Sequence, residues 1–155
     1  MIVGLATLGP LGRLKAPGTW GSAAGLLWWA VVVRPLTHGR APVHEAAFDL
    51  LVVLAAVCIC GAAAGILGRK DPQEVILDEF ACMPLVFVGL RLTAFPWLLA
   101  GFLLFRLLDI TKPLGIRRLE SLPLGIGIVA DDLAAALVAN GILHVVQMLA
   151  PAVLG

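Results

Sequence analysis

Five apolar segments make up most of the chain and limit its fold more than any other feature. They cover residues 19–33, 48–67, 75–90, 94–108 and 127–150. The 155 residues are 61% hydrophobic and only 14% charged, whereas a water-soluble domain is about 45–50% apolar and about 25% charged. Too few polar side chains remain to cover a surface that faces water. The composition therefore predicts an integral membrane protein, and the length fits one domain over residues 1–155.

The lengths of these segments indicate how each would meet a membrane. Only residues 48–67 and 127–150 reach the ~20 residues that span ~30 Å of hydrocarbon. The other three are shorter and would need tilting, a thinned bilayer or partial insertion. The expected fold class is all-α: a polytopic membrane helical bundle of about four to five apolar helices, some short or partly inserted. Residues 1–18, rich in glycine and proline, predict an irregular segment.

A helix-start pattern precedes the third apolar segment. Asp71, Pro72 and Glu74 fit the N-cap, N1 and N3 positions of a helix. We therefore expect the third helix to begin there, with Asp71 and Glu74 as helix-start residues. Asp78 and Glu79 would then lie nearly two turns further in, beyond any capping role.

Composition and motifs exclude several function classes. The net charge is only +1, and no basic stripe is present, so no nucleic-acid partner is expected. The N-terminus lacks a basic stretch ahead of an apolar core, so we expect no cleavable signal peptide. His38, His44 and His144 do not form a pair spaced to bind a metal.

Seven charged residues lie in or beside the apolar segments. They are Asp78, Glu79, Arg106, Asp109, Lys112, Asp131 and Asp132. A carboxylate in hydrocarbon is costly, so ionisable residues at such positions indicate a functional site. Three acid-bearing segments with basic groups close by predict a divalent cation and a phosphate as ligands.

Lysine and arginine residues are unequally shared between the two ends of the expected helices. If all five segments cross and the N-terminus is inside, eight basic residues are inside and three (Arg34, Arg40 and Arg91) outside. Cytoplasmic loops carry the excess of basic residues, which favours this orientation. Thr19 and the acidic residues of the three segments then all fall on the cytoplasmic side. We expect them to converge on one site there.

The spacing of Arg106, Asp109 and Lys112 puts them along one slanted helix face. Asp109 could bind a metal while Arg106 and Lys112 hold anionic oxygens; the alternative is a self-neutralising charge ladder at the helix end. Carboxylates without clustered cysteine or histidine select a hard cation, Mg²⁺ before Zn²⁺. A Mg²⁺ ion that polarises a phosphoryl oxygen and orients water suits phosphomonoester hydrolysis.

The candidate residues form two groups. The catalytic and Mg²⁺-binding candidates are Asp78, Glu79, Asp109, Asp131 and Asp132. The substrate-binding candidates are Thr19, Ser22, Arg106, Lys112 and Arg117. Adjacent helical residues point ~100° apart, so only one member of each acidic pair is expected to bind the metal directly. For Thr19 and Ser22, beside Gly18 and Gly21, a helix-packing face is the alternative.

Four sequence blocks in this order resemble the phosphatidylglycerophosphatase A family. They are residues 18–22, 71–79, 105–117 and 125–132. The resemblance implies an all-helical, Mg²⁺-dependent lipid phosphatase of the bacterial inner membrane, multi-pass, with its active site facing the cytoplasm. Its substrate would be phosphatidylglycerophosphate and its products phosphatidylglycerol and inorganic phosphate. Carried over by position, the functional residues would be Thr19, Asp78, Glu79, Arg106, Asp109, Lys112, Arg117, Asp131 and Asp132.

Two other functions fit parts of the sequence. A small ion or proton transporter would use buried acids along a pathway, but its acids would be spread in depth across the bilayer. A non-catalytic subunit of a lipid-synthesis complex would not need this set of charges. The sequence leaves open whether the chain works alone or as a homo-oligomer.

Overall fold

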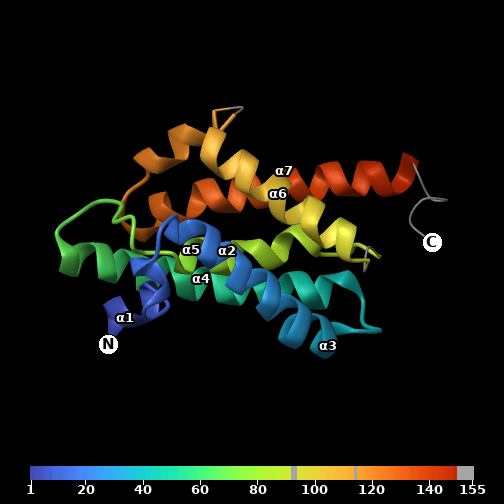
Figure 1. Ribbon diagram of the computed structural model, residues 1–155, viewed down its shortest axis with the longest axis horizontal. Coiled ribbons are helices and arrows are strands. Elements are labelled where there is room, and N and C mark those ends of the chain that lie inside the picture. The colour runs from blue at the N-terminus through green and yellow to red at the C-terminus, as the bar shows by residue number, and fades with distance from the viewer. Residues whose placement is uncertain (92–93, 114, 150–155) are drawn as a thin grey trace.

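The computed structural model describes residues 1–91, 94–113 and 115–149, and in this part of the chain every regular element is a helix (Figure 1). Ala150, the last residue of the fifth apolar segment, lies outside the described residues. The α-helices are α1 (Ile2–Ala6), α2 (Pro17–Trp28), α3 (Arg34–Thr37), α4 (Pro42–Leu67), α5 (Leu77–Cys82), α6 (Phe95–Thr111) and α7 (Leu124–Leu149). One π-helical stretch, η2 (Trp29–Val33), joins α2 to α3, and three short 3₁₀ helices are η1 (Leu11–Arg13), η3 (Met83–Phe87) and η4 (Ile116–Ser121). The all-α prediction is confirmed.

Two helices, α4 and α7, are long and apolar enough to cross a membrane. Each has 26 residues, which corresponds to about 39 Å of helix and exceeds the ~30 Å of hydrocarbon. They pack against each other. On α4, Val53, Ala56 and Cys60 are buried, whereas Leu51 and Leu54 on the other face are exposed. Helix α4 therefore has one face in the protein core and one apolar face that is exposed.

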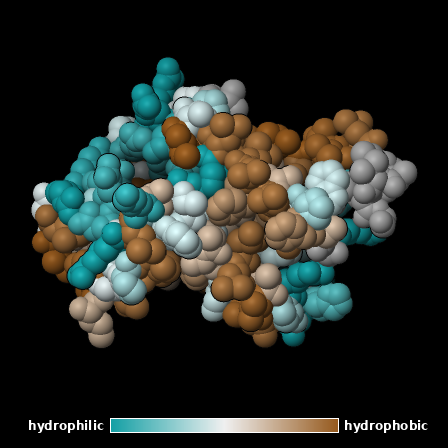
Figure 2. All heavy atoms as spheres, in the orientation of Figure 1, coloured by the Kyte–Doolittle hydropathy of each residue, from teal (hydrophilic) through white to brown (hydrophobic). Residues whose placement is uncertain are grey.

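The face of the molecule seen in Figure 2 is hydrophobic between two hydrophilic ends. Figure 2 shows polar residues gathered over the left end of the molecule and at the lower right, with apolar residues between them. The left end holds the last turn of α4 and the first turns of α5 and α7, and the lower right holds α3 (Figure 1). Such an apolar band between polar ends suits a protein that sits in a bilayer.

The third apolar segment differs from the expectation of one membrane helix. It forms two short pieces, α5 and η3, and residues from Ala81 to Phe87 are buried inside the bundle. Pro84 lies where an α-helix would need an N–H donor, so the chain tightens into a 3₁₀ helix there. Helices α2, α4 and α7 all contact α5. This apolar run is covered by other helices of the protein.

The start of this helix was predicted wrongly. Helix α5 begins at Leu77, and residues 71–76 form a loop. The Ile76 N–H donates a hydrogen bond to the Ala6 carbonyl (2.9 Å), and this contact ties the loop to α1. Asp78 and Glu79 therefore lie in the first turn of α5 and not two turns inside it. Residues 1–18 also contain α1 and η1 and are not irregular throughout.

The glycines before Asp131 belong to the first turn of α7 and not to a flexible loop. A Cβ added at Gly125 would overlap the carbonyl oxygen of Val57 and lie 2.7 Å from the Gly61 nitrogen. Glycine at this position therefore allows α7 to approach the backbone of α4 directly.

Gly125→Ala is expected to destabilise the fold by about 1–3 kcal/mol, because the added methyl group forces α4 and α7 apart. Gly141→Ala is the matched control: it lies in the same helix and its added Cβ meets no atom within 4 Å. Thermal unfolding of both variants in detergent measures the effect, at about 2–4 °C per kcal/mol. Gly141→Ala should leave the midpoint unchanged or raise it, because alanine favours helix. Equal midpoints for the two variants would contradict the close contact at Gly125.

Candidate active site

A polar cavity of about 430 Å³ lies at the end of the bundle on the left of Figure 1. Its walls come from the start of α2, the loop after α4, the first turn of α5, the end of α6 and the first half of α7. Six acidic and two basic side chains line it: Asp71, Asp78, Glu79, Asp109, Asp131, Asp132, Arg106 and Lys112. The expected convergence of all five candidate carboxylates is present in the structure. The excess of acidic over basic side chains suits this cavity to a cation.

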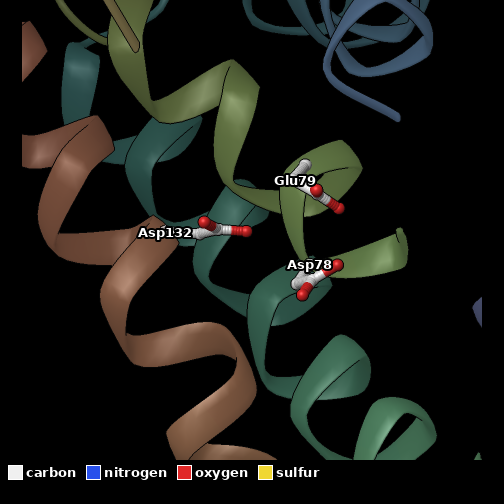
Figure 3. Close-up of side chains that lie close together, drawn as sticks. All are labelled: Asp78, Glu79 and Asp132. Carbon is white, nitrogen blue, oxygen red and sulfur yellow. The ribbon is translucent and has the colours of Figure 1, made fainter. Parts of the chain in front are cut away.

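Three of the carboxylates form the closest group. Asp78, Glu79 and Asp132 each offer an oxygen, and these oxygens lie within 4.8 Å of one another. Figure 3 shows Asp132 on α7 pointing toward the pair on α5. Asp78 and Asp132 are buried, and Glu79 is partly buried. Three acids brought this close repel one another unless a cation or protons lie between them.

Several oxygens in this cavity have no hydrogen-bond partner among the described residues. They include Asp78 Oδ1, Glu79 Oε2 and Asp131 Oδ1, all buried. A buried carboxylate oxygen without a donor is costly. An oxygen-loving cation would satisfy these atoms, and the donor set, which is all oxygen, suits Mg²⁺ better than Zn²⁺. The residues present therefore fit a magnesium ion.

Arg106 connects two of the acids. Its Nη1 lies 2.5 Å from Asp109 Oδ2 and 3.8 Å from Glu79 Oε1. The same nitrogen lies 3.4 Å from Ser22 Oγ. Asp109 is thus paired with Arg106 three residues earlier, as in the charge-ladder alternative, and it lies outside the group of three carboxylates. The pairing fixes the guanidinium at the cavity wall.

Ser22 and Gly18 hold the start of α2 against this arginine. Ser22 is fully buried, and its hydroxyl donates to the Gly18 carbonyl at 2.9 Å. Ser22 therefore lies behind Arg106 and does not line the cavity. A Cβ on Gly18 would overlap Glu79 Oε1. The helix-packing alternative describes this segment well.

Lys112 bridges two acids from distant parts of the chain. Its Nζ donates to Asp131 Oδ2 and to Glu120 Oε1, the latter at 2.7 Å. Burial alone would lower the pKa of Lys112, but these two hydrogen bonds outweigh it and raise the pKa above its ordinary value. The hydrogen bond from Lys112 lowers the pKa of Glu120. Lys112 therefore stays charged throughout the neutral pH range.

Two predicted substrate-binding residues lie away from the cavity. Thr19 is half-buried on α2, Arg117 is exposed on η4, and neither lines the cavity wall. Two further residues belong to the site: Asp71, which the sequence favoured as a helix-start residue over a ligand, and Glu120, to which it assigned no role. Asp71 lines the cavity from the loop where a helix start was expected, and Glu120 holds Lys112. Only the Asp71-Pro72 pair, within a family-like block, gave any signal in the sequence.

The fold and the site define a helical protein with two membrane-length helices and a carboxylate-rich cavity at one end. The family model described as "Phosphatidylglycerophosphatase A" matches residues 4–147. The chain belongs to the phosphatidylglycerophosphatase A family.

Curated relatives agree with the family model. The chain is 31% identical over 139 residues to phosphatidylglycerophosphatase A of Haemophilus influenzae, covering 85% of this chain and 79% of the relative. It is 32% identical over 133 residues to the protein of that name from Escherichia coli, covering 83% and 72%. A Bacteroides thetaiotaomicron relative, provisionally named a phosphatidylinositol-3-phosphatase, is 31% identical over 122 residues, covering 77% and 76%. No solved structure gives a significant match.

Proposed function

We propose that this chain hydrolyses the terminal phosphomonoester of phosphatidylglycerophosphate to phosphatidylglycerol and inorganic phosphate. The observation that carries the proposal is a cavity lined by six acidic and two basic side chains, in a chain that belongs to the phosphatidylglycerophosphatase A family. Two relatives named for this activity match over most of their length. The third relative's name points to a different lipid with the same chemical feature, a phosphate monoester.

Asp78, Glu79 and Asp132 would hold Mg²⁺, because their oxygens converge, and because Asp78 Oδ1 and Glu79 Oε2 have no hydrogen-bond partner among the described residues. When bound, Mg²⁺ supplies charge stabilisation at the phosphoryl oxygens and lowers the pKa of bound water. The protein supplies the arrangement of the acids before the substrate arrives. This proposal gives a ligand role to both members of the Asp78–Glu79 pair, whereas the sequence led us to expect only one direct ligand from each acidic pair.

The two basic side chains are suited to hold the phosphate. The Lys112 ammonium has three N–H donors, and two are used by Asp131 and Glu120, so one remains for a phosphate oxygen. Arg106 is fixed by Asp109, and its Nε has no partner among the described residues. Both cations therefore lie at the cavity wall with donor capacity left for an anion.

Asp131 has a further role open to it. Its Oδ2 accepts from Lys112, whereas its Oδ1 is buried and unpartnered in the described part of the chain. That oxygen can accept a hydrogen bond from a water molecule in the cavity. In the overall reaction a water oxygen forms the new bond to phosphorus, the bond from phosphorus to the glycerol oxygen breaks, and that oxygen takes up a proton.

We propose a multi-pass protein of the bacterial cytoplasmic membrane with this cavity facing the cytoplasm. Helices α4 and α7 would cross, and α2 and α6 would cross or insert partly. The cavity end of the bundle carries more basic residues than the other end, among them Arg69, Lys70 and Arg118, and cytoplasmic ends carry such an excess. The gathering of the acids at one end also favours an enzyme over a transporter with acids spread in depth.

Phosphate release by the purified chain in detergent tests the proposal. We expect one inorganic phosphate for each phosphatidylglycerol formed from phosphatidylglycerophosphate when Mg²⁺ is present. Phosphatidylinositol 3-phosphate, tested at the same concentration, should react much more slowly. Folded protein that releases no phosphate from either lipid would remove the enzyme proposal. Faster release from the inositol lipid would reassign the substrate.

A further inference from the structure

A second polar cavity, of about 490 Å³, lies at the opposite end of the bundle from the acidic one. It is formed by α3, the first turn of α4 and the segment after η3. Helix α4 separates the two sites, since it starts at this cavity and ends before Asp71, and its length is about 39 Å. The volume is in the range of small-molecule sites, about 300–1,000 Å³.

The charge of this cavity is basic. Arg34, Arg40 and Arg91 line it, with His38 beside them. None of the three arginines forms an ion pair with any described residue. Arginine guanidinium groups bind phosphate with paired hydrogen bonds. Three unpaired guanidinium groups around one hollow are therefore suited to an anion.

Glu45 is the one acidic residue among the described residues of the cavity wall, and both of its carboxylate oxygens already accept hydrogen bonds. Glu45 Oε1 accepts a hydrogen bond from Trp29 Nε1 at 2.8 Å, and Oε2 accepts from the Gly89 N–H at 3.4 Å. Arg34 lies over the Trp29 ring, 5.7 Å from its centroid. The Arg91 N–H donates to Gln147 at 2.9 Å, and this bond fixes the arginine's segment to α7. The walls are thus held by contacts that leave the arginine side chains available.

Apolar side chains surround the same cavity. Leu36 on α3 and Val43 in the first turn of α4 are exposed, at 56% and 66%, and Val31 on η2 is exposed as well. Leu36 and Val43 are next in sequence to Thr37 and Pro42, which line the cavity, and Val31 is two residues from Trp29, which also lines it. A ligand with a phosphate and hydrocarbon chains would match both the basic hollow and this apolar surround. Free inorganic phosphate would use only the first.

We propose that this cavity binds the phosphate group of an anionic phospholipid at the membrane surface opposite the acidic cavity. The proposal does not rest on the hydrolase activity, because no residue of the acidic cavity takes part. The arginines supply the selection for negative charge, and the exposed apolar residues supply contacts for the acyl chains.

Quenching of Trp29 fluorescence by brominated lipids tests the proposal, because Trp29 lines the cavity. The full chain with Trp20, Trp28 and Trp97 replaced by phenylalanine is placed in vesicles without divalent cations. Brominated phosphatidylglycerol is compared with brominated phosphatidylcholine at equal mole fraction. We expect the anionic lipid to be enriched at Trp29 by about fivefold or more. The enrichment should vanish in Arg34→Ala/Arg40→Ala/Arg91→Ala.

The matched control removes the same charge elsewhere. Arg13→Ala/Lys15→Ala/Arg118→Ala alters three exposed basic residues outside this cavity and should keep the enrichment. Equal quenching by both lipids, or loss of enrichment in both triple variants, would overturn the proposal. Displacement of the brominated lipid by millimolar inorganic phosphate would assign the site to free phosphate instead.

Native mass spectrometry tests the same proposal on the chain with its four tryptophans intact, so its result does not depend on whether the fluorescence variant folds. One phosphatidylglycerol fewer should remain bound in the Arg34→Ala/Arg40→Ala/Arg91→Ala protein than in the unaltered protein, while phosphatidylcholine binding stays the same. Equal retention of phosphatidylglycerol by the two proteins would also overturn the proposal.

Discussion

Asp132→Asn is expected to lower turnover of phosphatidylglycerophosphate by about three orders of magnitude. Asparagine keeps the shape of the side chain but removes the negative charge that α7 contributes to the group with Asp78 and Glu79. The fold should survive and even gain stability without added cation, because one of three mutually repelling carboxylates is gone. Steady-state kinetics and the thermal unfolding midpoint, measured on the same preparation, check both expectations.

Asp49→Asn provides the matched control for this variant. Asp49 is another buried aspartate on a membrane-length helix, 1% exposed, and both of its oxygens lack partners among the described residues. It lies in the second turn of α4, far from the acidic cavity, so its replacement should leave turnover unchanged. Normal turnover in Asp132→Asn, or an equal loss in both variants, would remove Asp132 from the catalytic group.

Removal of divalent cations is expected to abolish phosphate release, with full recovery when Mg²⁺ is added in excess over the chelator. The six acidic side chains of the cavity face only two basic ones, so without a cation the phosphate monoester dianion would meet net negative charge. Binding of Mg²⁺ should also raise the unfolding midpoint, since a ligand that binds only the folded state stabilises it.

The effect of Mg²⁺ on stability separates binding from catalysis. The midpoint should rise with Mg²⁺ in the unaltered chain and much less in Asp132→Asn. Undiminished phosphate release in the presence of chelator would remove the metal from the proposed function. A midpoint that rises equally in both proteins would place the cation elsewhere.

The sequence predicted the helical class and the gathering of the acids better than the internal helix boundaries. Hydrophobic length identifies α4 and α7, because among the described helices these two are long and apolar enough to cross the hydrocarbon. The acids were found because ionisable side chains are costly in apolar segments. Both inferences depend on local sequence alone.

The third apolar segment shows where such reasoning fails. An apolar run reads the same whether lipid or other helices cover it, so nothing local indicated that α5 and η3 are buried by α2, α4 and α7. Glu120 was missed for a related reason. Its role comes from a contact with Lys112, eight residues away across a turn, and an acid in a polar loop is otherwise ordinary.

Thr19 and Arg117, which were predicted to bind substrate, do not line the cavity. Each lies close in sequence to residues of the cavity, but α2 turns Thr19 aside and η4 leaves Arg117 exposed. Neighbourhood in sequence is a weak guide to direction on a helix, because successive side chains diverge by ~100°. The resemblance to a family could mark these segments but not which side of each segment faces the cavity.

The close packing of α2 on α5 bears on how this chain can change over evolution. A Cβ at Gly21 would lie 2.7 Å from the Ile76 carbonyl oxygen, and one at Gly25 would lie 2.5 Å from that of Phe80. Direct contact with the backbone of α2 therefore fixes the position of α5, the helix that carries Asp78 and Glu79. Exposed apolar positions such as Leu51 can change to other apolar residues with little consequence, whereas a single methyl group at Gly21 or Gly25 would displace the acids themselves.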